Sequence, residues 1–151
     1  VTLCVAPASG LAQNGRDAAP ATRATSAHTA SLYERLGGYD AIASFVGLVF
    51  PRVATHPELA HLFRGHGLDS QQRQLQLVVE MVCSATGGPC IYIGRDMEPV
   101  HDGLGITDDM WDVFMGIIDE GMREVGIPSS EARDFREVWA SFRPGVVRPN
   151  P

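Results

Sequence analysis

Apolar residues in this chain recur at intervals of three and four, the spacing that places side chains on one face of an α-helix. One such stripe consists of Ile42, Phe45, Val46, Val49, Phe50 and Val53. It predicts a first long helix over residues 39–54. Pro51 lies inside that helix and cannot donate a hydrogen bond to the carbonyl of Gly47, so we expect a kink there.

The next helical segments are separated by turn-forming residues. A short turn of helix is expected between His56-Pro57 and Leu62-Phe63. A second long helix is predicted to begin at a cap formed by Asp69 or Ser70 and to end at Gly87-Gly88-Pro89, because glycine permits a positive φ and proline cannot continue a helix. The stripe along one face of this helix consists of Gln74 and the apolar residues Leu75, Val78, Val79 and Val82.

Two further helices are predicted in the last third of the chain. Thr107, followed by Asp108 and Asp109, supplies a cap and favourable negative charge at a helix start. That helix carries Trp111, Phe114, Met115, Ile118, Met122 and Val125. The last helix begins near Ser129 and presents Phe135, Val138, Trp139 and Phe142. Because no sustained period-two alternation occurs, the predicted fold class is all-α.

The composition narrows the possible functions. The 151 residues suit one domain, and 44% hydrophobic with 20% charged residues are typical of a folded globular chain. The net charge is −6 and Lys and Arg form no dense run, so we expect no nucleic-acid partner. No apolar stretch reaches about 18 residues, which predicts that no segment spans a membrane.

The N-terminal region differs from the rest. Residues 1–13 are first apolar and then small, like the end of a secretory signal with its cleavage site. On that interpretation the protein is exported or periplasmic; the alternative is a leader without a targeting role on a cytoplasmic protein. We expect residues 1–27 to form this leader, residues 28–146 the folded domain and residues 147–151 a tail.

Two cysteines lie in the predicted domain. Cys83 and Cys90 flank the Gly87-Gly88-Pro89 turn, and in an exported protein they could form a disulfide across it. Free buried thiols, which pack as small apolar residues, are the alternative that we favour. Because no Cys-x-x-Cys occurs, the sequence gives no support for a zinc or thioredoxin-like site.

One histidine stands out. Residues 90–105 are rich in glycine and proline, so we expect a loop with at most a short helix at residues 98–102. Within it, His101 follows Met97 by four and precedes Leu104 by three, and therefore shares a helix face with apolar residues. A neutral imidazole beside an apolar wall is a candidate ligand for haem iron. A histidine with a purely structural role is the alternative.

Four short motifs occur in order between residues 31 and 106, within a resemblance that covers about residues 31–142. They are Ser31-Leu32-Tyr33-Glu34-Arg35-Leu36-Gly37-Gly38, Leu62-Phe63, Gly87-Gly88-Pro89 and Tyr92-x-Gly94-x-x-Met97-x-x-x-His101-x-x-Leu104-x-Ile106. Each is weak alone, but their joint order and spacing resemble the truncated haemoglobin family, in particular the group that keeps both glycine motifs. Four long amphipathic helices and a loop bearing a histidine also suit that resemblance.

The resemblance implies a fold and a cofactor. The fold would be a truncated globin, a two-over-two helical sandwich around haem b, with the iron held by His101. Phe63 would wedge against the haem, and Tyr92 and Met97 belong to the motif on the proximal side. In many relatives a tyrosine that donates a hydrogen bond to bound oxygen stands where this chain has Phe50.

The resemblance leaves two alternatives for the residues of the second long helix that would face the haem from the side opposite His101. Counting back from the glycine turn puts Gln74 at the entrance of the pocket and Val78 one turn further in. Counting forward from Phe63 instead gives Gln71 and Leu75 for these two places. We prefer the first, because an insertion is easier in the loop at residues 64–69 than in a helix.

Three functions are compatible with these observations. The first is reversible binding of oxygen, and also of carbon monoxide or nitric oxide, at the haem iron. The second is a haem enzyme, a nitric oxide dioxygenase or a peroxidase, which would need an electron donor such as a reductase; Phe50 in place of the tyrosine weakens this reading. The third, a cofactor-free helical interaction module, is preferred only if His101 is exposed.

Overall fold

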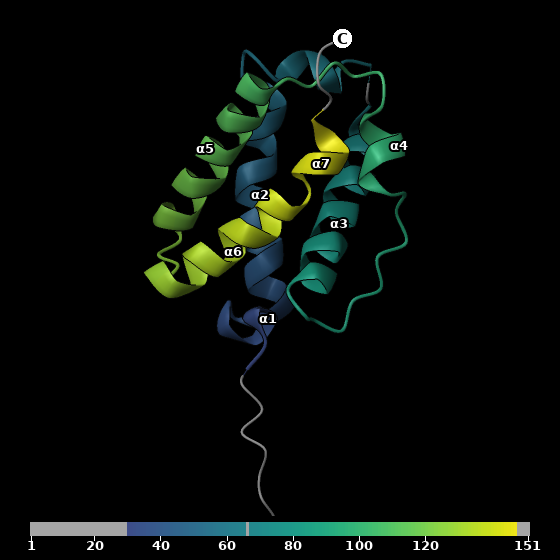
Figure 1. Ribbon diagram of the computed structural model, residues 1–151. Coiled ribbons are helices and arrows are strands. Elements are labelled where there is room, and N and C mark those ends of the chain that lie inside the picture. Colours follow the sequence, from purple (N-terminus) through teal and green to yellow (C-terminus); the bar gives the residue numbers. More distant parts are fainter. Residues whose placement is uncertain (1–29, 66, 148–151) are drawn as a thin grey trace, which may run out of the picture.

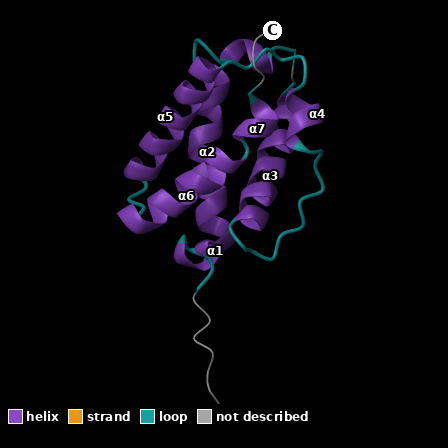
Figure 2. Cartoon of the chain, viewed as in Figure 1, coloured by secondary structure: helices purple, strands orange, loops and turns teal. Residues whose placement is uncertain are grey.

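Every regular element in the part of the chain that the structure describes is a helix (Figure 2). The computed structural model describes residues 30–65 and 67–147. The elements are α1 (Leu32–Arg35), α2 (Gly38–Thr55), the 3₁₀ helix η1 (Ala60–Phe63), α3 (Leu68–Ala85), α4 (Met97–His101), α5 (Asp108–Glu124), α6 (Ser129–Ser141) and α7 (Arg143–Val146). The all-α prediction is confirmed.

The first two helices follow from local interactions. The Ser31 hydroxyl accepts a hydrogen bond from the Glu34 N–H while the Glu34 carboxylate accepts one from the Ser31 N–H, a capping box that starts α1. Gly37, at a φ of +98°, turns the chain into α2. α2 matches the predicted first long helix to within one residue at each end, and it continues through Pro51 to Thr55.

α3 differs from the prediction at its start. The sequence predicts a cap at Asp69 or Ser70, but Gly67 is the cap and both residues lie in the first turn. The prediction was wrong because Gly67 is already extended and its carbonyl accepts the N–H of Gln71 at 3.0 Å. The end is as predicted: Gly87, at a φ of +85°, follows the last turn.

Cys83 and Cys90 form a disulfide, with their Cα atoms 5.8 Å apart. Our preference for free thiols was therefore wrong. The glycine turn between them brings the two residues together. A Cβ atom on Gly88 would lie 2.7 Å from both the Sγ atom and the carbonyl oxygen of Cys83, so only glycine lets the chain pass this close.

The C-terminal part of the chain contains one helix more than predicted. The Thr107 hydroxyl accepts the N–H of Met110 at 3.3 Å and caps α5, as expected. α6 begins at Ser129, also as expected. After Phe142 the chain enters α7, whose start is marked by Pro144 in the first turn, a favoured place for proline.

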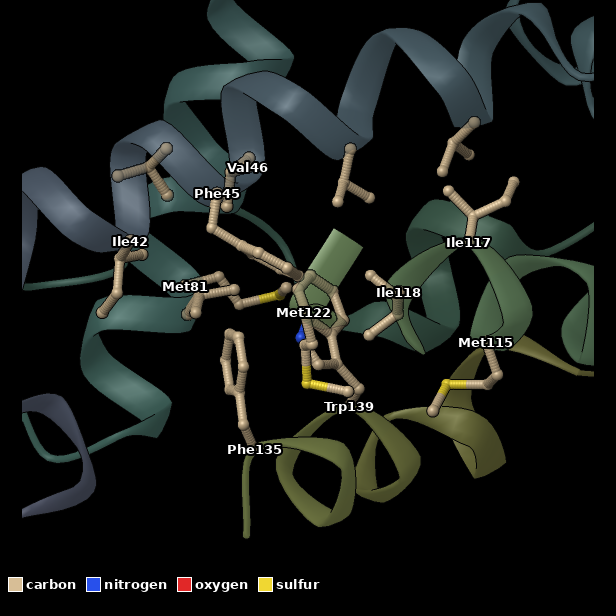
Figure 3. Packing of buried hydrophobic residues seen from close by; sticks show 14 of the residues in the cluster. Ile42, Phe45, Val46, Met81, Met115, Ile117, Ile118, Met122, Phe135 and Trp139 are labelled. Carbon is tan, nitrogen blue, oxygen red and sulfur yellow. The ribbon is translucent and has the colours of Figure 1, made fainter. Parts of the chain in front are cut away.

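The core lies between the long helices α2, α3, α5 and α6. α2 packs against α3 and α5, and α5 packs against α6. Figure 3 shows side chains of α2, α5 and α6 converging, with Phe45 and Phe135 edge to face at a centroid distance of 5.2 Å. Among the described residues no helix is long and apolar enough to cross a membrane. The predicted leader and residues 148–151 of the predicted tail lie outside the described residues.

Candidate functional site

A cavity of about 750 Å³ opens between the helices, a size typical of sites for small organic ligands. Its wall is built by α2, η1, α3, the loop before α4, and α4 to α7. All seven predicted site residues line it: Phe50, Phe63, Gln74, Val78, Tyr92, Met97 and His101. The fold therefore brings together side chains that lie far apart in the sequence, while their contacts with a cofactor stay a prediction.

His101 is the last residue of α4 and is half-buried in the cavity wall. Its Nδ1 atom lies 2.8 Å from the carbonyl oxygen of Met97. Since a carbonyl can only accept, we assign the proton to Nδ1, which leaves the Nε2 lone pair available to a metal. Because His101 is not exposed, the condition for a cofactor-free interaction module is not met.

The side of the cavity formed by α2, η1 and α3 is largely apolar. The ring of Phe50 stands edge-on to that of Phe63, with centroids 5.8 Å apart and an interplanar angle of 87°. Of the four candidates on α3, Gln74 and Val78 line the cavity, whereas Gln71 and Leu75 are not part of its lining. The lining thus agrees with counting back from the glycine turn.

Two buried polar atoms in the cavity wall have no hydrogen-bond partner in the described part of the chain: Oε1 of Gln74 and Nε1 of Trp139. Buried polar groups are normally paired, so unpaired ones need an explanation such as a bound group. An amide can present its oxygen or, after a flip, its NH₂ group. A cavity with apolar walls, one free imidazole nitrogen and one unpaired amide end fits a haem and a ligand on its iron.

Tyr92 lies in the loop between α3 and α4. Its hydroxyl donates a hydrogen bond to the carbonyl of Arg95 at 2.8 Å. Burial raises the pKa of Tyr92 above its usual value, and the nearby Asp96 carboxylate raises the pKa further, so the hydroxyl stays protonated. A Cβ atom on Gly94 would lie 2.1 Å from the Tyr92 hydroxyl oxygen, which explains the glycine at that position.

The sequence did not reveal every part of the wall. Trp111, Phe114, Trp139, Phe142 and Val146 also line the cavity. All but Val146 were placed on apolar stripes, but helical spacing alone does not tell a cavity wall from a packed core. Arg73 and Arg95 are exposed lining residues and so lie where the cavity meets solvent. No cluster of three or more His, Cys, Asp or Glu side chains in the described residues could hold a metal ion.

Comparison with known proteins identifies the family. A family model described as bacterial-like globin matches residues 31–147. The chain belongs to this family of globins. The globin is 29% identical over 121 residues to a group 1 truncated haemoglobin from Mycolicibacterium paratuberculosis, an alignment that covers 80% of this chain and 87% of that protein.

Solved structures agree with the fold. A truncated haemoglobin from Tetrahymena pyriformis in the Fe(III) form superposes on this globin with a TM-score of 0.73 and 21% identity, over 80% of this chain and all of that one. A 2/2 haemoglobin from Synechococcus sp. gives 0.70 and 22%, over 78% and 98%. The truncated globin sandwich is thus confirmed. Family membership implies haem with its iron and a diatomic gas as ligand.

Proposed function

We propose that this globin holds haem b through Nε2 of His101 and binds oxygen reversibly, and also carbon monoxide or nitric oxide. The observation that carries the proposal is the 2.8 Å contact between His101 Nδ1 and the Met97 carbonyl in the wall of an apolar cavity. A histidine that bonds a backbone carbonyl through one ring nitrogen has a fixed orientation and tautomer, as metal-bound histidines usually do.

The other residues have separate tasks in this proposal. Haem, when bound, supplies an iron atom with one position for a gas molecule. Phe50, Phe63 and Val78 would surround the space for the gas with apolar side chains and limit the access of water to it. Gln74 offers the cavity a side-chain amide whose Oε1 is buried and unpaired, and an amide turned over at this place would present its NH₂ group to a ligand.

The experiment is a haem titration of the purified protein followed by absorption spectroscopy. We expect an intense Soret band at one haem per chain, a shift of that band with carbon monoxide, and an oxygen complex that is reversed by removing oxygen. Absence of the band would contradict the proposal. If the protein rapidly forms nitrate from nitric oxide under turnover with a reductant, the alternative hypothesis, a nitric oxide dioxygenase, is favoured over reversible gas binding.

We also propose that the protein is exported to an oxidising compartment such as the periplasm. The Cys83–Cys90 disulfide supports this, because disulfides persist there and are rare in the cytosol. Cell fractionation combined with thiol alkylation under denaturing conditions tests it. Recovery of the protein in the cytosolic fraction with both thiols alkylated would contradict it.

A further inference from the structure

The backbone of α7 passes close to α4 at Gly145. A Cβ atom on Gly145 would lie 2.8 Å from Cβ of Met97 and 3.3 Å from the backbone nitrogen of Glu98. Gly145 is helical and is not among the glycines with a positive φ. Glycine is therefore needed here for close packing and not for an unusual backbone conformation.

α4 is a short helix. It has five residues, none of them buried, and no side chain caps its N-terminus. Within the described residues α7 is its main helical neighbour, and the two lie side by side in Figure 1. α7 itself is held by an ion pair between Arg143 and Asp108 at the start of α5 and by the buried side chain of Val146.

The same contact reaches the histidine. Met97, which a side chain on Gly145 would strike, is also the residue whose carbonyl accepts the hydrogen bond from Nδ1 of His101. We propose that Gly145 is a positioning residue: the absence of a side chain there lets α7 set the place of the α4 backbone, and through the Met97 carbonyl the place of Nε2 of His101. This inference rests on the proposed role of His101 as the iron ligand.

The main test compares two glycine substitutions in the haem-loaded protein. Gly145→Ala adds a methyl group where Met97 and Glu98 already lie, so one of the two helices must move. Gly116→Ala is the matched control, because Gly116 is also helical and has no other atom within 4 Å of its Cβ position. We expect Gly145→Ala to shift the iron–histidine stretching band in resonance Raman spectra and to speed haem transfer to apomyoglobin roughly fivefold or more. Gly116→Ala should change neither.

A second comparison separates positioning from general loosening of the cavity. In His101→Gly with added imidazole, the ligand on the iron is no longer attached to α4. Gly145→Ala in that background should leave the iron–imidazole band unchanged. A shift of equal size in both backgrounds would overturn the inference, because the substitution would then act on the cavity as a whole.

Arg143→Ala keeps the inference testable if Gly145→Ala does not fold. It removes the ion pair with Asp108 without adding any atom near α4, and we expect a smaller shift of the same band. Arg136→Ala, which removes an exposed ion pair with Asp119 on α5, is its control and should leave the band in place.

Each outcome points to one of the two proposals. If neither Gly145→Ala nor Arg143→Ala moves the band while His101→Gly loses it and imidazole restores it, the positioning role is wrong and the ligand assignment stands. If His101→Gly keeps the original band without imidazole, the ligand assignment is wrong, and the positioning role falls with it.

Discussion

Cys83 and Cys90, seven residues apart in the sequence, are joined by a disulfide that links the last turn of α3 to the loop before α4. Cys83 is fully buried, whereas Cys90 is half-buried on the loop. Two residues later the same loop supplies Tyr92 to the cavity wall. The disulfide therefore ties part of the cavity wall to the core.

Breaking this bond should lower the free energy of unfolding. The loop it closes is short, and loop-closure entropy for that length corresponds to about 2–3 kcal/mol. Urea unfolding with and without dithiothreitol measures the loss, in a Cys4→Ser background so that the third cysteine of the chain cannot exchange with the disulfide. Cys90→Ala in the same background should show the lower stability at once and no response to the reductant. A response of Cys90→Ala as large as that of the parent would contradict the prediction.

His101→Ala should sharply weaken haem binding, because the haem would be held only by packing against Phe63 and its neighbours. Competition with apomyoglobin measures the rate of haem loss. His61→Ala is the control, since His61 is exposed and does not line the cavity. Retention of haem and of the original spectrum in His101→Ala would mean that another residue binds the iron.

Deletion of residues 1–27 should change neither folding nor haem binding. This leader has no apolar periodicity with which to join a core, and all helices of the described structure start after it. Chemical unfolding and haem titration of the shortened protein provide the measurement. A loss of more than about 1 kcal/mol, the size of an ordinary point-mutation effect, would show that the leader packs on the domain.

The long helices could be predicted because each buries one face. The stripe that includes Phe45 and Val49 gave α2 almost to the residue, since a period of three and four persists over its whole length. α7 could not be found in this way, because four residues are too few to show a period. The cap of α3 was also missed, since Gly67, Asp69 and Ser70 are all acceptable caps in sequence terms.

The site was predictable where a motif fixed the spacing. Counting back from the glycine turn after α3 selects Gln74, and Gln74 lines the cavity whereas Gln71 does not; its contact with a ligand stays a prediction. The disulfide was not predictable, because spacing alone does not give the distance between two sulfur atoms or the redox state of the compartment. The close packing of Gly145 against α4 at Met97 joins segments almost fifty residues apart, and no local sequence pattern predicts it.

The distal side of the cavity should control how long oxygen stays bound. The oxygen ligand carries partial negative charge, so a donor within about 3 Å slows its escape. Phe50 has no donor, and Gln74 is the amide side chain that α3 supplies to the cavity. Gln74→Leu removes one hydrogen bond worth about 1 kcal/mol and should speed oxygen release roughly fivefold. Stopped-flow measurement of oxygen dissociation tests this, and carbon monoxide, which is less polar when bound, should respond less.

Two further variants show whether the effect comes from this hydrogen bond. Gln71→Leu is the matched control, because Gln71 is on the same helix but not in the cavity lining, and oxygen release should be unchanged. Phe50→Tyr adds a hydroxyl beside Phe63 and should slow release, provided that the hydroxyl turns into the cavity. Faster release from Gln71→Leu with none from Gln74→Leu would overturn the assignment of the distal residue. No change from either would mean that α3 supplies no hydrogen bond to the ligand.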